Sequence, residues 1–304
     1  KGSNFLDFIK LVKQRDLFSK DQIYKSIRNA ENQMIKNGVV AVGDICNTSD
    51  TINQKKKRNL QYRNLVEVFQ VNNDKVEATL DNAKSLKNQF VSESLHANIV
   101  PHSSYSVTPK LMSLIKNMLS EESSIFSIHM QETFYEKKLF KEKKGPLKRW
   151  LTSIDADPTI WASFTSPLHS ISHINSNNIL LVHNTYKETK DNSNYYYCTC
   201  PNSNIILESK LPNYNLFDTE RLCVGTDSLA SNDKLSILDE LLTIQSNSNF
   251  SLETLLKIAS KNGAKALKFS RLGTFEKGKF PGINLLQNLN QFELTEKSRV
   301  IKLV

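Results

Sequence analysis

The stretch LHANIVPHSSYSVTPKLM (95–112) contains a complete strand-to-helix connection. Its first part is a short apolar run of strand length that ends at the polar His102. Further on, Thr108 supplies an N-cap and Pro109 a first-turn proline, which together predict a helix running to Ser120. The stretch therefore predicts a strand that leaves a histidine at its carboxyl end before the chain turns into a helix.

The same alternation of strand and helix precedes this stretch. Ser19 opens a capping-box sequence, SKDQ, and begins a predicted helix that stops at Gly38. Two apolar strands are predicted next, and a polar helix follows the second. The strands are VVAVGD (39–44) and LVEVFQV (65–71), and the helix is 74–90.

The alternation also continues after this stretch, to the end of a helix that we expect to stop at Gly263. Seven apolar strands alternating with helices predict a parallel sheet covered by helices, one strand short of a closed (β/α)₈ barrel. The remaining predicted elements are strands at 124–132, 178–184, 195–200 and 221–225, a basic, partly helical segment at 134–151, and helices at 236–245 and 251–262. After Leu267 the sequence becomes glycine-punctuated and antiparallel in character.

Composition excludes several classes of protein. The chain of 304 residues is 39% hydrophobic, and no apolar run approaches the length of about 18–20 residues that crosses a bilayer. The formal charge of +9 comes mainly from dispersed lysines, so nucleic-acid binding ranks last among the functions considered.

Four cysteines without a CxxC pair favour a reducing cytoplasm. Cys198 and Cys200 alternate along a strand, so we expect that both cannot point into one site.

Polar residues stand at the ends of four separate predicted strands. His102, His129, His183 and Asp227 all take this position, and such ends converge on one face of a parallel barrel. Imidazole and carboxylate groups are ligands of zinc and similar metals, which lower the pKa of bound water from about 15.7 to about 7. Glu132, in HMQE, is placed to act as a general acid.

Six segments, taken in order, resemble the amidohydrolase superfamily. They are most similar to its chlorohydrolase and aminohydrolase branch, which includes triazine hydrolases, adenosylhomocysteine and methylthioadenosine deaminases, and guanine deaminase-like enzymes. The resemblance covers roughly residues 5–285. The segments are HSSYSVTPKLM (102–112), SIHMQET (127–133), LLVHNTY (180–186), CPNSNIIL (200–207), VGTDSLASND (224–233) and NGAKALKF (262–269).

The resemblance implies a role for each of these polar residues. His129 and Asp227 match metal ligands, and Asp227 also matches the residue that relays the proton of the attacking water. Glu132 matches the general acid, while His183 matches a contact to the attacking water or the substrate. His102 matches a substrate contact. The resemblance implies one divalent metal ion. Zinc is the first choice and iron the alternative.

The family's first strand ends in His-x-His, which supplies two further metal ligands, and this pair is absent. We therefore expect an N-terminally incomplete (β/α)₈ TIM-type barrel that lacks its first strand. Residues 1–270 would form strands two to eight of the barrel, and residues 271–304 a remnant of a small C-terminal β-sandwich.

The function favoured by this reading is hydrolysis of a C–N bond in a heterocycle, with deamination of a purine or related base or nucleoside as the leading reaction. We then expect a cytoplasmic protein whose partner is a small heterocyclic substrate. Neither nucleic acid nor a membrane is expected as a partner, and a homodimer is left open. The alternative is a catalytically incomplete fragment or pseudoenzyme without tightly bound metal, because the His-x-His pair is missing.

Overall fold

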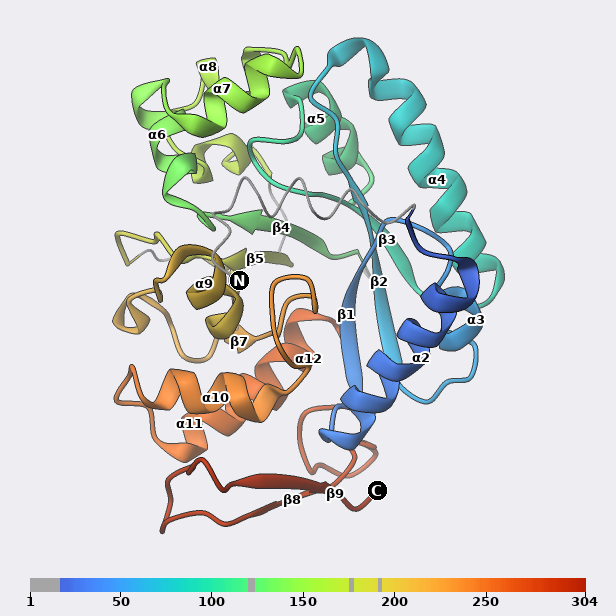
Figure 1. The fold of residues 1–304 in the computed structure, drawn as a ribbon, viewed down its shortest axis with the longest axis vertical. Coiled ribbons are helices and arrows are strands. Elements are labelled where there is room, and N and C mark those ends of the chain that lie inside the picture. The colour runs from blue at the N-terminus through green and yellow to red at the C-terminus, as the bar shows by residue number, and fades with distance from the viewer. Residues whose placement is uncertain (1–16, 120–123, 175–177, 191–192) are drawn as a thin grey trace.

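A computed structural model describes residues 17–119, 124–174, 178–190 and 193–304. Within these residues, seven parallel strands form a three-stranded sheet of order β1-β2-β3 and a four-stranded sheet of order β4-β5-β6-β7 (Figure 1). The seven parallel strands expected from the sequence are thereby confirmed. They are β1 (Ala41–Cys46), β2 (Gln61–Val68), β3 (Ala97–Pro101), β4 (Phe126–Met130), β5 (Ile179–His183), β6 (Tyr196–Thr199) and β7 (Leu222–Val224).

The two sheets meet at the carboxyl ends of β3 and β4. The backbone N–H of His129 donates to the carbonyl oxygen of His102 over 2.9 Å, and Ser103 forms an isolated parallel bridge with His129. The strands thus follow one arc from β1 to β7, and these two strands are its edges in the described part of the chain. The barrel is not closed there, and a further strand between the edges stays a prediction.

The helices lie along the outside of this arc (Figure 1). Among the described residues, none is long and apolar enough to cross a membrane. They are α2 (Lys20–Lys36), α3 (Ile52–Lys55), α4 (Val76–Ser92), α5 (Pro109–Asn117), α6 (Phe134–Glu142), α7 (Pro146–Ser153), α8 (Thr159–Ala162), α9 (Pro201–Glu208), α10 (Ile237–Gln245), α11 (Leu252–Lys257) and α12 (Gly263–Ala266).

Helix starts follow the capping chemistry expected from the sequence. The Ser19 side chain accepts from the Gln22 backbone N–H, and the Gln22 side chain accepts from the Ser19 N–H, completing the capping box of α2. Thr108 caps α5 by accepting from the Leu111 N–H over 3.3 Å. The expected end of α5 at Ser120 lies outside the described residues, and the helix ends at Asn117.

The prediction that the 251–262 helix stops at Gly263 is wrong. A π-helical turn, Ile258–Asn262, leads directly into α12, and Gly263 has a helical φ of −60°. The buried Asn262 side chain donates to the carbonyl oxygens of Thr219 and Leu222, each over 2.7 Å. These contacts with the segment entering β7 hold the turn, so the glycine continues the helix instead of ending it.

The end of α12 links strands from both sheets. Leu267 packs against Gly43 of β1, where a Cβ would lie 2.8 Å from a Leu267 methyl group, so a larger residue there would displace the Leu267 side chain. The Arg63 guanidinium, from β2, donates to the carbonyl oxygens of Leu267 and Lys268, each over 2.9 Å. Asn178, just before β5, donates to Ala266 O over 3.1 Å. This junction joins the two sheets at the amino ends of their strands.

The C-terminal segment forms a separate antiparallel pair, β8 (Asn284–Gln287) and β9 (Arg299–Lys302), visible at the bottom of Figure 1. It contacts the end of α2: the Asn284 side chain donates to Gly38 O over 2.8 Å. Gly38 has a φ of +79° and no space for a Cβ, so it ends the helix as expected. Assignment of this pair to a β-sandwich domain from residue 271 stays a prediction.

A substitution at Phe90 tests how α4 packs against the sheet. It lies in α4 with 0% exposure, within the main hydrophobic cluster. Phe90→Ala should lower the free energy of unfolding by about 3–5 kcal/mol, because it removes a buried ring and leaves a cavity. Val91→Ala, at the neighbouring position with 50% exposure, is the matched control and should change it by less than about 0.5 kcal/mol. Urea denaturation followed by circular dichroism measures both, and equal effects would contradict the assigned packing.

Candidate active site at the carboxyl ends of the strands

The five polar side chains singled out in the sequence lie together at one end of the strand arc. His102 follows β3, His129 lies in β4, Glu132 follows β4, His183 ends β5 and Asp227 follows β7. The ring centroids of His102 and His129 are 5.0 Å apart, and those of His129 and His183 are 5.3 Å apart. His183 Nε2 lies 3.6 Å from Glu132 Oε1. Asp227 is close enough to His183 and His129 to interact with both electrostatically.

The His129 ring is held through one of its two nitrogens. Nδ1 lies 2.8 Å from the carbonyl oxygen of His102, which can only accept, so Nδ1 carries the proton. Glu67 Oε1 lies 3.4 Å from the same nitrogen. Nε2 is therefore the lone-pair nitrogen, as in most metal-binding histidines, whose other ring N–H is anchored by a carbonyl or carboxylate.

His183 is held by a residue of α9. Its Nδ1 lies 3.0 Å from Asn204 Oδ1, and both side chains are buried. Since the amide oxygen is an acceptor, Nδ1–H donates and Nε2 remains available on the side of Glu132. The backbone of His183 has a φ of +73°, unusual for a residue with a Cβ.

Asp227 is surrounded by donors. Its Oδ2 accepts from the Ser203 hydroxyl over 2.8 Å and from the Ser231 hydroxyl over 2.5 Å, and Oδ1 accepts from the Ser228 N–H over 2.7 Å. Burial alone would raise the pKa of Asp227, but the neighbouring His183 and the Ser231 hydroxyl outweigh it, and the pKa is lowered. Asp227 is therefore an ionised, oriented carboxylate.

Glu132 has the opposite protonation behaviour. Burial raises its pKa to about 8, only partly offset by His129. The Glu132 backbone N–H donates over 2.8 Å to the carboxyl group of Glu136, which caps α6 from its first turn. A carboxyl group that keeps its proton near neutral pH can donate it to a reacting atom.

His102 is a neutral imidazole. Desolvation lowers its pKa to about 4, although Glu67 acts in the opposite direction. Its Nδ1 lies 2.8 Å from the Ser106 hydroxyl, which in turn lies 2.7 Å from the Ser103 hydroxyl. The Ser103 hydroxyl thus belongs to the hydrogen-bond network that fixes the ring.

Three metal-ligating side chains form a close group within the ranges that the structure describes: Glu67, His102 and His129. One ligand atom of each lies within 4.8 Å of those of the other two. Two metal ligands were expected, His129 and Asp227. His129 belongs to this group, and Asp227 does not. Glu67 was missed because the strand was expected to run to residue 71. In fact β2 ends at Val68, which places Glu67 at the carboxyl end, and its charge within an apolar run was the available signal.

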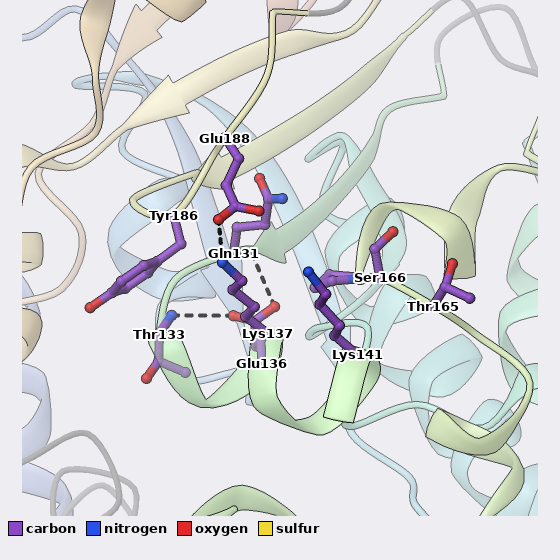
Figure 2. Close-up of a pocket in the computed structure, with 10 residues that line it drawn as sticks. Gln131, Thr133, Glu136, Lys137, Lys141, Thr165, Ser166, Tyr186 and Glu188 are labelled. Carbon is purple, nitrogen blue, oxygen red and sulfur yellow. Dashed lines mark hydrogen bonds and ion pairs between the residues drawn. The ribbon is translucent and has the colours of Figure 1, made fainter. Parts of the chain in front are cut away.

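A small pocket of about 80 Å³ is lined by residues of α6 and of the segments after β4 and β5 (Figure 2). Gln131 and Thr133, on either side of Glu132 in the chain, contribute to it, but the three histidines and Asp227 do not. Figure 2 shows Lys137 of α6 reaching across to Glu188, with which it forms an ion pair. The lining residues are Gln131, Thr133, Glu136, Lys137, Lys141, Thr165, Ser166, Pro167, Tyr186 and Glu188.

The expectation that Cys198 and Cys200 cannot approach one place is wrong. Their sulfur atoms lie 3.1 and 3.7 Å from the point that a Cβ on Gly225 would occupy. Side chains two residues apart in a strand point to the same face, so alternation brings Cys198 and Cys200 together instead of separating them. β6 ends at Thr199, and Cys200 is the N-cap of α9. Both thiols therefore line the backbone just before Asp227.

Known proteins share this arrangement of strands. The chain is 28% identical over 262 residues to an adenosine deaminase of Helicobacter pylori, covering 80% of this chain and 63% of that protein. The crystal structure of Helicobacter pylori aminofutalosine deaminase superposes with a TM-score of 0.73 at 26% identity, covering 88% of this chain and 71% of that one. An atrazine chlorohydrolase of Arthrobacter aurescens complexed with zinc has the same fold, with a TM-score of 0.70 at 14% identity over 93% of this chain and 69% of that one.

The chain thus spans less than two thirds of the length of the curated adenosine deaminase that it matches. The family model described as "Amidohydrolase family" matches residues 3–304 of this chain. With this match over nearly its whole length, the chain belongs to the amidohydrolase family.

Proposed function

We propose that this chain carries the catalytic face of a metal-dependent hydrolase that deaminates a heterocycle, a purine or related base or nucleoside. The observation that carries the proposal is the pairing of an ionised Asp227 with a protonated Glu132 around the buried His183. One carboxyl group can accept a proton while the other donates one, which is the division of work that hydrolysis of a C–N bond requires.

The side chains present fit a divalent cation. Nδ1 of His129 is bound to the His102 carbonyl, so its Nε2 has a free lone pair for a metal ion. The nearby Asp227 carboxylate is ionised and can supply an oxygen ligand. A cation held there would lower the pKa of a water molecule and so supply the nucleophile. Zinc is the proposed ion, with iron as the alternative, and the atrazine chlorohydrolase with this fold was solved with zinc.

The protein residues then divide the proton transfers. Asp227 takes the proton of the attacking water, and the Ser203 and Ser231 hydroxyls hold its Oδ2 in place. Glu132 gives its proton to the ring nitrogen next to the attacked carbon. Asp227 then passes its proton to the exocyclic amino nitrogen, the C–N bond breaks and ammonia leaves. The hydroxyl group on the carbon returns its proton to Glu132, and the carbon keeps the water oxygen as a carbonyl oxygen.

Two histidines contact the substrate in this proposal. His183, fixed by Asn204, presents Nε2 beside Glu132 to the attacking water or the substrate. His102, neutral and fixed by Ser106, presents its other nitrogen to the heterocycle. Adenosine-type nucleosides lead the substrate classes because the relatives reported above are adenosine and aminofutalosine deaminases. Guanine, cytosine and triazines are the next compounds to assay.

Asp227→Asn tests the proton acceptor. In the natural protein loaded with zinc, this change should lower kcat for ammonia release from adenosine-type nucleosides by about 10²–10⁴, because the amide cannot accept the proton. Asp233→Asn, at an exposed position of the same loop, is the control and should leave kcat unchanged. Coupled ammonia assays measure both. Full activity in Asp227→Asn would refute the assigned role, and a wild type inactive on every heterocycle would favour the metal-free alternative.

The pH profile tests the proton donor. Because the pKa of Glu132 is raised to about 8, its acid form dominates below that pH and is lost above it. We expect kcat to fall as the pH rises through about 8. Glu132→Gln should remove this limb and lower kcat by about 10²–10⁴, since the amide keeps the shape without the acidic proton. A wild-type profile that stays flat to pH 10 would contradict the role.

A further inference from the structure

Three of the four cysteines of the chain lie together where the backbone leads to Asp227. Cys198 of β6 and Cys223 of β7 are register partners on neighbouring parallel strands, so their side chains project to the same side of the sheet. Cys200 follows β6 as the N-cap of α9. The sulfur atoms of Cys198 and Cys200 both lie within 3.7 Å of the point that a Cβ on Gly225 would occupy.

The Cys198 sulfur is the shared acceptor of this thiol cluster, Cys198, Cys200 and Cys223. The thiols of the other two donate hydrogen bonds to it, which lowers the pKa of Cys198 and raises the pKa of each donor. Cys198 is also partly exposed, whereas Cys200 and Cys223 are buried. Thiolate character, solvent access and a second thiol nearby are the properties of cysteines that peroxides oxidise reversibly.

The fourth cysteine has a different environment. Cys46 of β1 is buried, and desolvation raises its pKa to about 12. Its sulfur contacts Lys55 Nζ at 3.3 Å. A buried thiol that keeps its proton is chemically inert, so Cys46 is an internal reference for the reactivity of the cluster.

We propose that Cys198 is an oxidation site for hydrogen peroxide and that Cys223 converts the oxidised sulfur into a disulfide. The O–O bond of peroxide breaks, one oxygen bonds to the Cys198 sulfur as a sulfenic acid, and the other leaves as water. The Cys223 sulfur then attacks the Cys198 sulfur, the S–O bond breaks, and a second water leaves. The two thiols lose two electrons and two protons, and the peroxide is reduced to two water molecules.

Strand pairing favours Cys223 over Cys200 as the second thiol. Register partners on neighbouring strands have Cα atoms about 4.8 Å apart, within the range of about 4.4–6.8 Å that a disulfide spans. Cys198 and Cys200 are two residues apart along an extended segment, which places their Cα atoms about 6.6 Å apart, near the upper limit. A disulfide that shifts its strands to form is strained, and strained disulfides are readily reduced again.

The cluster lies on both backbone segments that position Asp227. Cys200 opens α9, whose Ser203 donates to Asp227, and Cys223 lies in the strand that leads to it. Formation of the disulfide should therefore move the carboxylate. This consequence rests on the proposed function: oxidation should lower kcat for deamination at least about tenfold, because a displacement of about 1 Å can cost about 10²-fold in rate.

Peptide mapping of peroxide-treated protein tests the pairing without using turnover. The natural protein is treated with hydrogen peroxide, the remaining thiols are alkylated in denaturant, and the peptides are analysed by mass spectrometry. We expect a Cys198–Cys223 cross-link, with Cys46 and Cys200 alkylated. Dithiothreitol should remove the cross-link. Cys46→Ser is the control and should form it as the wild type does, whereas Cys198→Ser should form no cross-link.

Other products overturn the proposal. A bridge between Cys198 and Cys200 refutes the pairing, and sulfinic acid at Cys198 without a bridge refutes the role of the second thiol. Unmodified cysteines in excess peroxide refute the oxidation site. If thermal melting shows that Cys198→Ser does not fold, the wild-type peptide map decides alone. Ammonia release is assayed on the same samples: a cross-link that leaves kcat unchanged refutes the effect on Asp227, whereas inactivity of the reduced protein contradicts only the proposed deamination.

Discussion

The carbonyl oxygen of His102 is the point on which both the fold and the candidate site depend. It accepts the backbone N–H of His129 over 2.9 Å and the Nδ1–H of the same residue over 2.8 Å. The first bond joins the β1–β3 sheet to the β4–β7 sheet, and the second sets the direction of the His129 ring. One acceptor therefore couples the register of two sheets to the orientation of a metal-type ligand, so a shift between the sheets would turn the ring as well.

Three residues at the candidate site have left-handed backbone conformations. His183, Asn184 and Asp227 have φ values of 73°, 54° and 57°, although none is glycine. Such conformations cost about 1–3 kcal/mol each and persist only where the surroundings enforce them. Helix α9 provides that enforcement: its Asn204 holds His183 and its Ser203 holds Asp227. The segment following β6 thus stabilises two strand ends that would otherwise relax away from each other.

The sequence predicted what depends on local chemistry. The Ser19 capping box, the Thr108 N-cap and the apolar strands follow from short-range patterns, and so does a histidine at a strand end. Features set by distant contacts were not predictable. Gly263 reads as a helix stop until the Asn262 side chain is seen bound to carbonyl oxygens of the segment entering β7. Glu67 is one more charge in a strand until β3 and β4 bring two imidazoles beside it.

The opposite protonation of the two carboxyl groups arises first from the neighbouring His183, which lowers the pKa of Asp227, and then from hydrogen-bond donors. Both are buried near the same histidines, and burial alone would raise both pKa values. Asp227 receives two hydroxyl groups and a backbone N–H, each of which stabilises the ionised form. The Glu132 carboxyl group has His183 Nε2 at 3.6 Å, too far for a hydrogen bond, while Asp227 itself opposes a second negative charge nearby. Ionising Asp227 therefore helps to keep the proton on Glu132, which is what the proposed division into base and acid requires.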